Sequence, residues 1–257
     1  KVFNLPIYIC DDCKLYVLGT LQDELDTKLN HYYDSEFWEK TNSQIKLDDN
    51  FSDDYSKGRI RIWQSQFKYC KTIIKKNTKI LEIGSGHGEA IYNFDQLGFE
   101  VIGIEPDKKN VLNINKKLKQ SKCILGNAET FELNQKFDLI WMNHVFEHLS
   151  KPIEILERCK KFLNNMGHIF IEVPSVEKIN DYRTFTTTPH AYNYSKLALE
   201  NICKKSNYSI IECDYFRSPT MFEGGINKIF KNIYKFYPKI LTDKNCGENI
   251  RIILQKP

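Results

Sequence analysis

Three histidines and one glutamate are the residues of this chain best suited to proton or metal chemistry. His144, Glu147 and His148 stand within one short segment, and His190 lies in a later loop. Imidazole titrates near neutral pH, so it can take the proton of an acceptor hydroxyl. His144 and His190 are the predicted catalytic bases, because both lie at the expected carboxyl edge of a sheet, where ligands bind.

The H-x-x-E-H segment that begins at His144 also allows a metal site. On a helix, His144 and His148 would share one face with Glu147 alongside, and histidines at this spacing can bind one ion. That site is an alternative to the main prediction, in which the chain holds no metal.

A glycine-rich loop is the clearest ligand-binding feature. A short apolar strand at residues 79–83 leads into GSGHG at residues 84–88. Loop glycines let the backbone pass close to a ligand. The dinucleotide fingerprint G-x-G-x-x-G would need glycine where Glu89 stands, and that acid would face a pyrophosphate. With Glu82 just before the loop, the pattern favours a cationic sulfonium ligand.

A second acid stands where a nucleoside would bind. A strand at residues 100–104 is followed by Glu105, which lies about 20 residues after the first loop glycine. At that place an acid can accept both ribose hydroxyls. The loop and Glu105 together predict a site for an adenosyl group.

The elements that must position these residues alternate between strand and helix. Apolar segments predict strands at residues 79–83, 100–104, 123–125, 137–142, 167–173, 208–214 and 249–255. Periodic segments predict helices at residues 58–76, 89–97, 107–119, 152–163 and 195–206. These units predict an α/β doubly wound, Rossmann-like fold with a mostly parallel seven-stranded sheet and helices on both faces.

The order of these motifs resembles that of the class I S-adenosylmethionine-dependent methyltransferases. The likeness is greatest to the small-molecule branch, which includes the ubiquinone-biosynthesis O-methyltransferases and sugar methyltransferases. The resemblance implies S-adenosylmethionine as the cofactor and S-adenosylhomocysteine as the product. The cofactor contacts that it implies are Glu82, Gly84, Ser85, Gly86, Gly88, Glu105, Pro106, Asn127, Ala128, Glu129, Asn143 and, at the cofactor carboxylate, Arg59.

The resemblance also bears on the histidines. In similar enzymes the loop that here carries His190 often faces the acceptor. The ubiquinone branch has an acidic residue at the position of His144 and can use a divalent metal there. His144 departs from that pattern, which puts a metal in doubt.

Residues 1–54 are predicted to form an N-terminal extension. The catalytic domain would span residues 55–257, with an insert at about 216–247. Cys10 and Cys13 supply half of a four-ligand zinc site. They resemble the second cysteine pair of the zinc ribbon in some sugar-modifying methyltransferases. The first pair would lie upstream of Lys1, so free thiols are expected. Aromatic residues at 31–38 are expected to cover the active site and to shape the acceptor pocket.

Composition limits the partners. Apolar residues make up 41% of the chain, and the net charge of +4 is spread along it. We expect no nucleic-acid partner, because there is no basic stripe, and no membrane span, because no long apolar run exists. A cytoplasmic monomer or homodimer is expected.

The predicted function is O-methylation of a small polar metabolite. A sugar or a nucleotide-activated precursor of surface (capsule) polysaccharide is the favoured acceptor. The alternatives are an N- or C-methyltransferase that acts on a similar metabolite, or a non-catalytic nucleoside-binding subunit.

Overall fold

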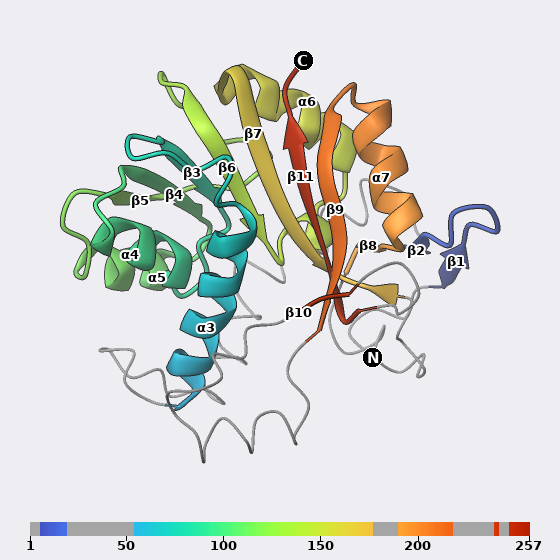
Figure 1. Ribbon diagram of the computed structural model, residues 1–257, viewed down its shortest axis with the longest axis horizontal. Coiled ribbons are helices and arrows are strands. Elements are labelled where there is room, and N and C mark those ends of the chain that lie inside the picture. The colour runs from blue at the N-terminus through green and yellow to red at the C-terminus, as the bar shows by residue number, and fades with distance from the viewer. Residues whose placement is uncertain (1–5, 20–53, 177–189, 218–238, 242–246) are drawn as a thin grey trace.

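The fold centres on one large sheet (Figure 1), seen in a computed structural model that describes residues 6–19, 54–176, 190–217, 239–241 and 247–257. Its strands lie in the order β10 (Lys239–Leu241), β9 (Ser209–Arg217), β11 (Asn249–Gln255), β7 (Leu163–Pro174), β6 (Phe137–Asn143), β3 (Ile80–Ile83), β4 (Val101–Glu105) and β5 (Lys122–Leu125). Strands β3 to β7 pair in parallel, whereas β11 runs antiparallel between β7 and β9. The mostly parallel seven-stranded sheet is confirmed, and the three-residue β10 extends its edge.

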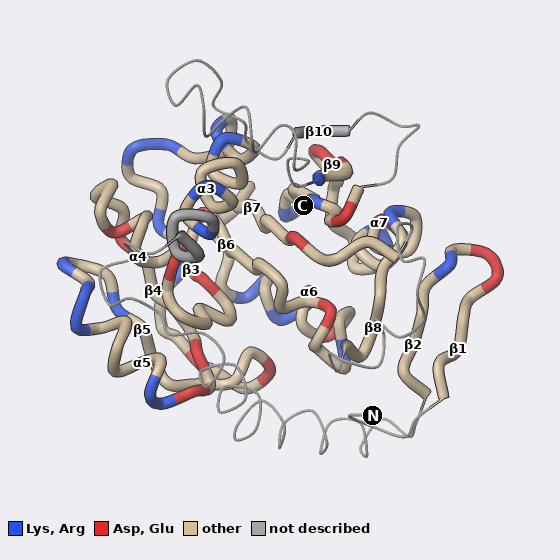
Figure 2. Tube along the Cα trace, turned by 90° about the horizontal axis from the view of Figure 1, so that it is seen from below, with Lys and Arg blue, Asp and Glu red and all other residues tan. Residues whose placement is uncertain are grey.

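Helices cover both faces of this sheet. On one face lie α3 (Asp54–Tyr69), α4 (Glu89–Gln96) and α5 (Lys108–Asn115), and on the other α6 (Pro152–Phe162) and α7 (Lys196–Lys205). The view along the sheet in Figure 2 shows α3 and α4 on one side and α6 and α7 on the other. Each central strand serves both faces: Ile80 packs with the α3–α5 core, and Leu81 packs with the α6–α7 core. This double burial explains why the strands are continuously apolar.

Local hydrogen bonds set the helix ends. The side chains of Asp107 and Ser195 accept backbone N–H groups at the starts of α5 and α7, at 2.7 and 3.0 Å. Helix α5 is shorter than predicted. The N–H groups of residues 119–121 donate to the carboxylate of Asp95 at 2.8–3.0 Å instead of continuing the helix.

A second, small sheet joins the N-terminal residues to the catalytic domain. Strands β1 (Ile7–Ile9) and β2 (Tyr16–Leu18) form an antiparallel hairpin, and β2 pairs with β8 (Tyr192–Asn193). The Leu18 N–H also donates to the Ala191 carbonyl at 3.0 Å. The hairpin therefore lies directly beside the loop that carries His190. The aromatic residues at 31–38 and most of the predicted insert lie outside the described residues.

Among the described residues, every helix is too short or too polar to cross a membrane.

Candidate active site

The glycine loop takes a path that only glycine allows. It joins β3 to α4, and Gly84, Gly86 and Gly88 all have positive φ, at 74°, 55° and 90°. A Cβ added at Gly88 would lie 2.6 Å from Cγ1 of Ile114. The loop thus packs closely against Ile114 of α5. It lies at the carboxyl end of β3, where open α/β sheets bind ligands.

Glu105 lies beside this loop, at the end of β4. Its carboxylate accepts the backbone N–H of Gly86 at 2.8 Å and that of Asp107 at 3.1 Å. Burial raises the pKa of Glu105 to about 7. Each carboxylate oxygen has a second lone pair, so both can still accept a ligand hydroxyl.

Glu82 lies beneath the loop on β3. Its side chain is buried, and within the described part of the chain its Oε2 accepts no hydrogen bond. Burial raises the pKa of Glu82 well above its usual value. Burial therefore favours the neutral form of Glu82, in which the carboxyl group would donate a hydrogen bond.

Two further segments with predicted cofactor contacts lie at the same edge of the sheet, which is called the cofactor edge below. After β5, the Gly126 N–H donates to the Glu105 carbonyl at 3.0 Å, and Oδ1 of Asn127 accepts the Glu129 N–H at 2.8 Å. Ala128 lies between them, partly buried against the α6–α7 core. Pro106 directly follows Glu105. The segment predicted to frame an adenine thus lies next to the predicted ribose acid.

Helix α3 contributes two polar side chains at this edge. Arg59 forms a close ion pair with Glu89, the first residue of α4. Gln66, which the sequence analysis did not single out, donates to Oδ1 of Asn143 at 2.8 Å. These contacts hold Arg59 at the start of α4 and Asn143 at the end of β6, and their contacts with a cofactor stay predictions.

His144 belongs to a network of charges in which its own side chain is 41% exposed and its two carboxylate partners are buried. Its Nδ1 lies 3.3 Å from Glu147, and its Nε2 lies 3.5 Å from Glu172. Glu172 forms a close ion pair with Arg251, which donates to Oγ of Ser65 at 2.8 Å. The carboxylates of Glu147 and Glu172 favour the charged form of His144 and raise its pKa to about 10.

The raised pKa favours the protonated form of His144, which is not the form that a general base needs. An imidazolium has no lone pair with which to accept a proton. The helical geometry assumed for H-x-x-E-H is also wrong, since His144 has a φ of 53° and only a 3-10 turn, η2 (Phe146–His148), follows it. His144 therefore faces the two carboxylates and does not share a helix face with His148.

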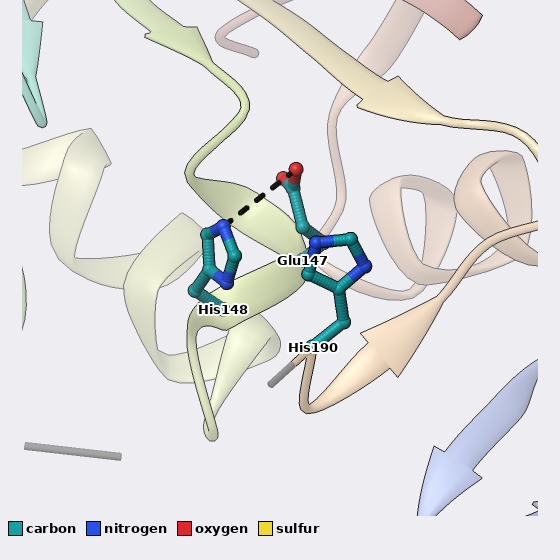
Figure 3. Close-up of side chains that lie close together, drawn as sticks. All are labelled: Glu147, His148 and His190. Carbon is teal, nitrogen blue, oxygen red and sulfur yellow. Dashed lines mark ion pairs between the residues drawn. The ribbon is translucent and has the colours of Figure 1, made fainter. Parts of the chain in front are cut away.

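His190 instead lies against His148. The two ring centroids are 4.7 Å apart at an interplanar angle of 67°. Nδ1 of His190 lies 2.9 Å from Oδ1 of Asn193. Because an amide oxygen only accepts, the neutral form of His190 in this contact carries its proton on Nδ1 and has a lone pair on Nε2. Figure 3 shows His148 and His190 on either side of Glu147.

The Cys10–Cys13 turn joins β1 to β2. Backbone N–H groups of Cys13 and Asp12 hydrogen-bond to the Cys10 thiol and lower its pKa. Both cysteines are free thiols. No third histidine, cysteine or acid among the described residues completes a metal site with them.

Comparison with known protein families identifies the family of this chain. A family model described as a methyltransferase domain matches residues 55–213, more than half of the chain. The chain belongs to this methyltransferase family. It is therefore an enzyme of the methyltransferase class, and the alternative of a non-catalytic subunit is set aside. The glycine loop and Glu105 fit S-adenosylmethionine, the cofactor that this assignment indicates.

Curated relatives of this methyltransferase are distant. An uncharacterized methyltransferase of Alkaliphilus oremlandii is 28% identical over 168 residues, which cover 63% of this chain and 70% of the relative. A tRNA U34 carboxymethyltransferase of Campylobacter fetus is 27% identical over 167 residues, which cover 58% of each protein. The match thus spans less than two thirds of the tRNA-modifying relative.

Solved structures share the fold of this methyltransferase. A plantazolicin methyltransferase in complex with a substrate analogue and S-adenosylhomocysteine has a TM-score of 0.62 at 13% identity, over 91% of this chain and 97% of that one. A magnesium protoporphyrin IX methyltransferase from Synechocystis with bound S-adenosylmethionine has a TM-score of 0.60 at 12% identity, over the same shares. At these identities the likeness describes the fold.

The sequence analysis missed four polar residues of the methyltransferase site: Gln66, Glu172, Asn193 and Arg251. One signal was available. Glu172 and Arg251 are single charges of opposite sign within apolar strands, and such residues are buried only when they are paired.

Proposed function

We propose that this methyltransferase transfers the methyl group of S-adenosylmethionine to an oxygen atom of a small polar acceptor. The observation that carries the proposal is the pair of hydrogen bonds from Gly86 and Asp107 to the Glu105 carboxylate. They hold an acid at the point where a nucleoside's ribose hydroxyls would lie, beside a loop that can approach the rest of the cofactor.

The sulfonium methyl group of the cofactor is the electrophile, so this chain has two tasks of its own. It must align the acceptor with the methyl group, and it must ease the loss of the acceptor proton. Asn143 stands at the end of β6, where we place the methionine part of the cofactor. His190 comes from a different segment and offers its Nε2 lone pair near the same sheet edge. We therefore place His190 at the acceptor oxygen and assign His144 to the buried charges that support β6.

The N-terminal hairpin supports a proposal for the acceptor class. We propose a sugar or a nucleotide-activated precursor of surface polysaccharide, in a reaction that takes place in the cytoplasm. Support comes from the resemblance of the Cys10–Cys13 segment to sugar-modifying methyltransferases. The hairpin pairs with β8, next to His190, where it can contribute to an acceptor pocket. Transfer to nitrogen or carbon of a similar metabolite is the alternative.

A labelling screen tests the proposal. The protein is incubated with S-adenosylmethionine that carries a deuterated methyl group, together with nucleotide sugars, free sugars, other hydroxylated metabolites and bulk tRNA. Mass spectrometry then locates the label. Glu105→Ala serves as the negative control. We expect label on an oxygen of a sugar-containing acceptor. Label on nitrogen, on carbon or on tRNA would contradict the proposed acceptor, and cofactor binding without any labelled product would contradict the activity.

A further inference from the structure

A cluster of ligand-type side chains lies beside the cofactor edge. Glu147 and His148 come from η2, and His190 comes from the segment just before β8. One nitrogen or oxygen atom from each of the three lies within 4.8 Å of the others. Figure 3 shows that the three side chains converge. Two imidazoles and one carboxylate are a common ligand set for first-row transition metals.

Glu147 is the buried carboxylate of this cluster, and His144 already supplies one positive charge beside it. Its side chain is 1% exposed, and neither carboxylate oxygen accepts a hydrogen bond from the residues that the structure describes. Its nearest charged neighbour is His144, at 3.3 Å, and His148 is at 3.9 Å. A buried carboxylate without hydrogen bonds is costly unless a positive charge lies close by. Because His144 is shared between Glu147 and Glu172, both carboxylate oxygens of Glu147 still have lone pairs that can bind a further cation.

The orientation of His190 suits a metal ligand. Metal-binding histidines usually donate their second ring N–H to an oxygen atom, which fixes the tautomer and the ring position. The 2.9 Å contact between Nδ1 of His190 and Oδ1 of Asn193 has that form. It leaves Nε2 as the ligand atom. His148 has a 17% exposed side chain, and the centroid of its ring lies 4.7 Å from that of the His190 ring, so both rings lie near the same point.

We propose that Glu147, His148 and His190 bind one divalent transition-metal ion, such as Zn²⁺, which contacts the acceptor hydroxyl. Bonds of about 2.0–2.2 Å require the side chains to close on the ion. Three protein ligands leave a position open for the acceptor, as in catalytic metal sites. His144 lies outside this ligand set, because its ring nitrogens face Glu147 and Glu172. The proposal replaces the sequence-based expectation of a metal-free site.

This inference rests on the proposed transfer to oxygen and says how His190 would serve it. The ion lowers the pKa of the hydroxyl that it contacts, so the hydroxyl proton passes to water. The oxygen lone pair then forms the bond to the methyl carbon while the carbon–sulfur bond breaks and its electrons stay on sulfur. The products are a methyl ether, neutral S-adenosylhomocysteine and one proton.

Calorimetric titration of the metal-stripped full chain with Zn²⁺ tests the site. Cys10→Ser and Cys13→Ser are introduced first, because these thiols also bind Zn²⁺. We expect one ion per chain. His190→Ala and His148→Ala should each weaken binding by more than about 100-fold, beyond the loss caused by changing a residue that only orients a ligand. Asn193→Ala should weaken it by about tenfold. His168→Ala is the matched control, since His168 contacts Gln255 on β11, away from the cluster.

A titration with S-adenosylmethionine accompanies each variant. Unchanged cofactor affinity in His190→Ala shows that the variant is folded. Absence of Zn²⁺ binding, or equal Zn²⁺ affinity in His190→Ala and His168→Ala, would overturn the metal site, and methyl transfer by the metal-free protein would then leave the proposed function standing. If Zn²⁺ binding depends on His190 but the labelling screen gives no oxygen-labelled product, the metal site would be supported and the proposed function contradicted.

Discussion

Replacement of Glu105 by alanine should weaken cofactor binding by about two orders of magnitude. In the proposed complex its carboxylate accepts hydrogen bonds from two ribose hydroxyls and retains those from the N–H groups of Gly86 and Asp107. A hydrogen bond to a charged group contributes about 1.5 kcal/mol at the lower end of its range. Loss of two such bonds removes about 3 kcal/mol, which corresponds to about 150-fold in Kd.

Isothermal titration calorimetry with S-adenosylmethionine measures this effect. Glu100→Ala is the matched control, because Glu100 lies just before β4, is about half exposed and forms an ion pair with Lys79 at 3.5 Å. A thermal melt confirms that Glu105→Ala is folded under the conditions used, since two backbone N–H groups lose their acceptor. A Kd within about twofold of the wild-type value would refute the ribose assignment, because one lost hydrogen bond of this kind already predicts about tenfold.

The raised pKa of Glu105 adds a pH dependence to the same experiment. In the protein without cofactor the carboxyl titrates at a pKa of about 7. Ribose hydroxyls donate to the ionised form, so binding requires the proton to leave. Affinity should therefore be constant above about pH 8 and should fall toward tenfold per pH unit below pH 7. Calorimetry in buffers of different ionisation enthalpy should detect the released proton, and a flat profile from pH 5 to 8 would contradict the mechanism.

Three further substitutions test the loop, the buried ions and the hairpin. Gly88→Ala should destabilise the fold by about 1–3 kcal/mol more than Gly98→Ala in urea denaturation, because both glycines have positive φ but only at Gly88 would the new Cβ meet other atoms. Arg251→Met should cost about 3–5 kcal/mol of unfolding free energy, since it leaves Glu172 buried without its partner. Leu18→Pro removes one backbone hydrogen bond to the loop before β8, which should raise the acceptor KM about fivefold and leave the cofactor Kd unchanged.

The cofactor side of the site follows from the sequence, because its signals are local. The glycine spacing predicts a loop at the end of β3, and Glu105 ends β4. Because β3 and β4 pair in parallel, their ends lie at the same edge of the sheet. The caps at Asp107 and Ser195 are local in the same way, because each side chain accepts a backbone N–H from only three residues further along the chain. Such features depend on a few consecutive residues and on the parallel order of the strands.

The acceptor side could not be predicted in this way, because long-range contacts create it. A positive φ at His144 turns the chain out of the helix that H-x-x-E-H suggests, and no residue type in the segment signals it. His148 meets His190 through the position of β8, which pairs with the N-terminal hairpin and also bonds to Ser150 through the Tyr192 hydroxyl. The ion pair between Glu172 and Arg251 joins two strands that are far apart in sequence.

The buried charges around His144 make most sense as a positioning device. Replacing a buried ion pair by apolar residues is often neutral or stabilising, so net stability is a weak reason for one to exist. Here the network ties the end of β6 to two other strands: His144 contacts Glu172 on β7, and Glu172 pairs with Arg251 on β11. Asn143 precedes this anchor and Glu147 follows it in the same chain segment. In-line methyl transfer depends on the alignment of donor and acceptor to a fraction of an ångström. A rigid connection between Asn143, which is predicted to contact the cofactor, and Glu147, which is proposed to bind the ion that contacts the acceptor, would supply that alignment.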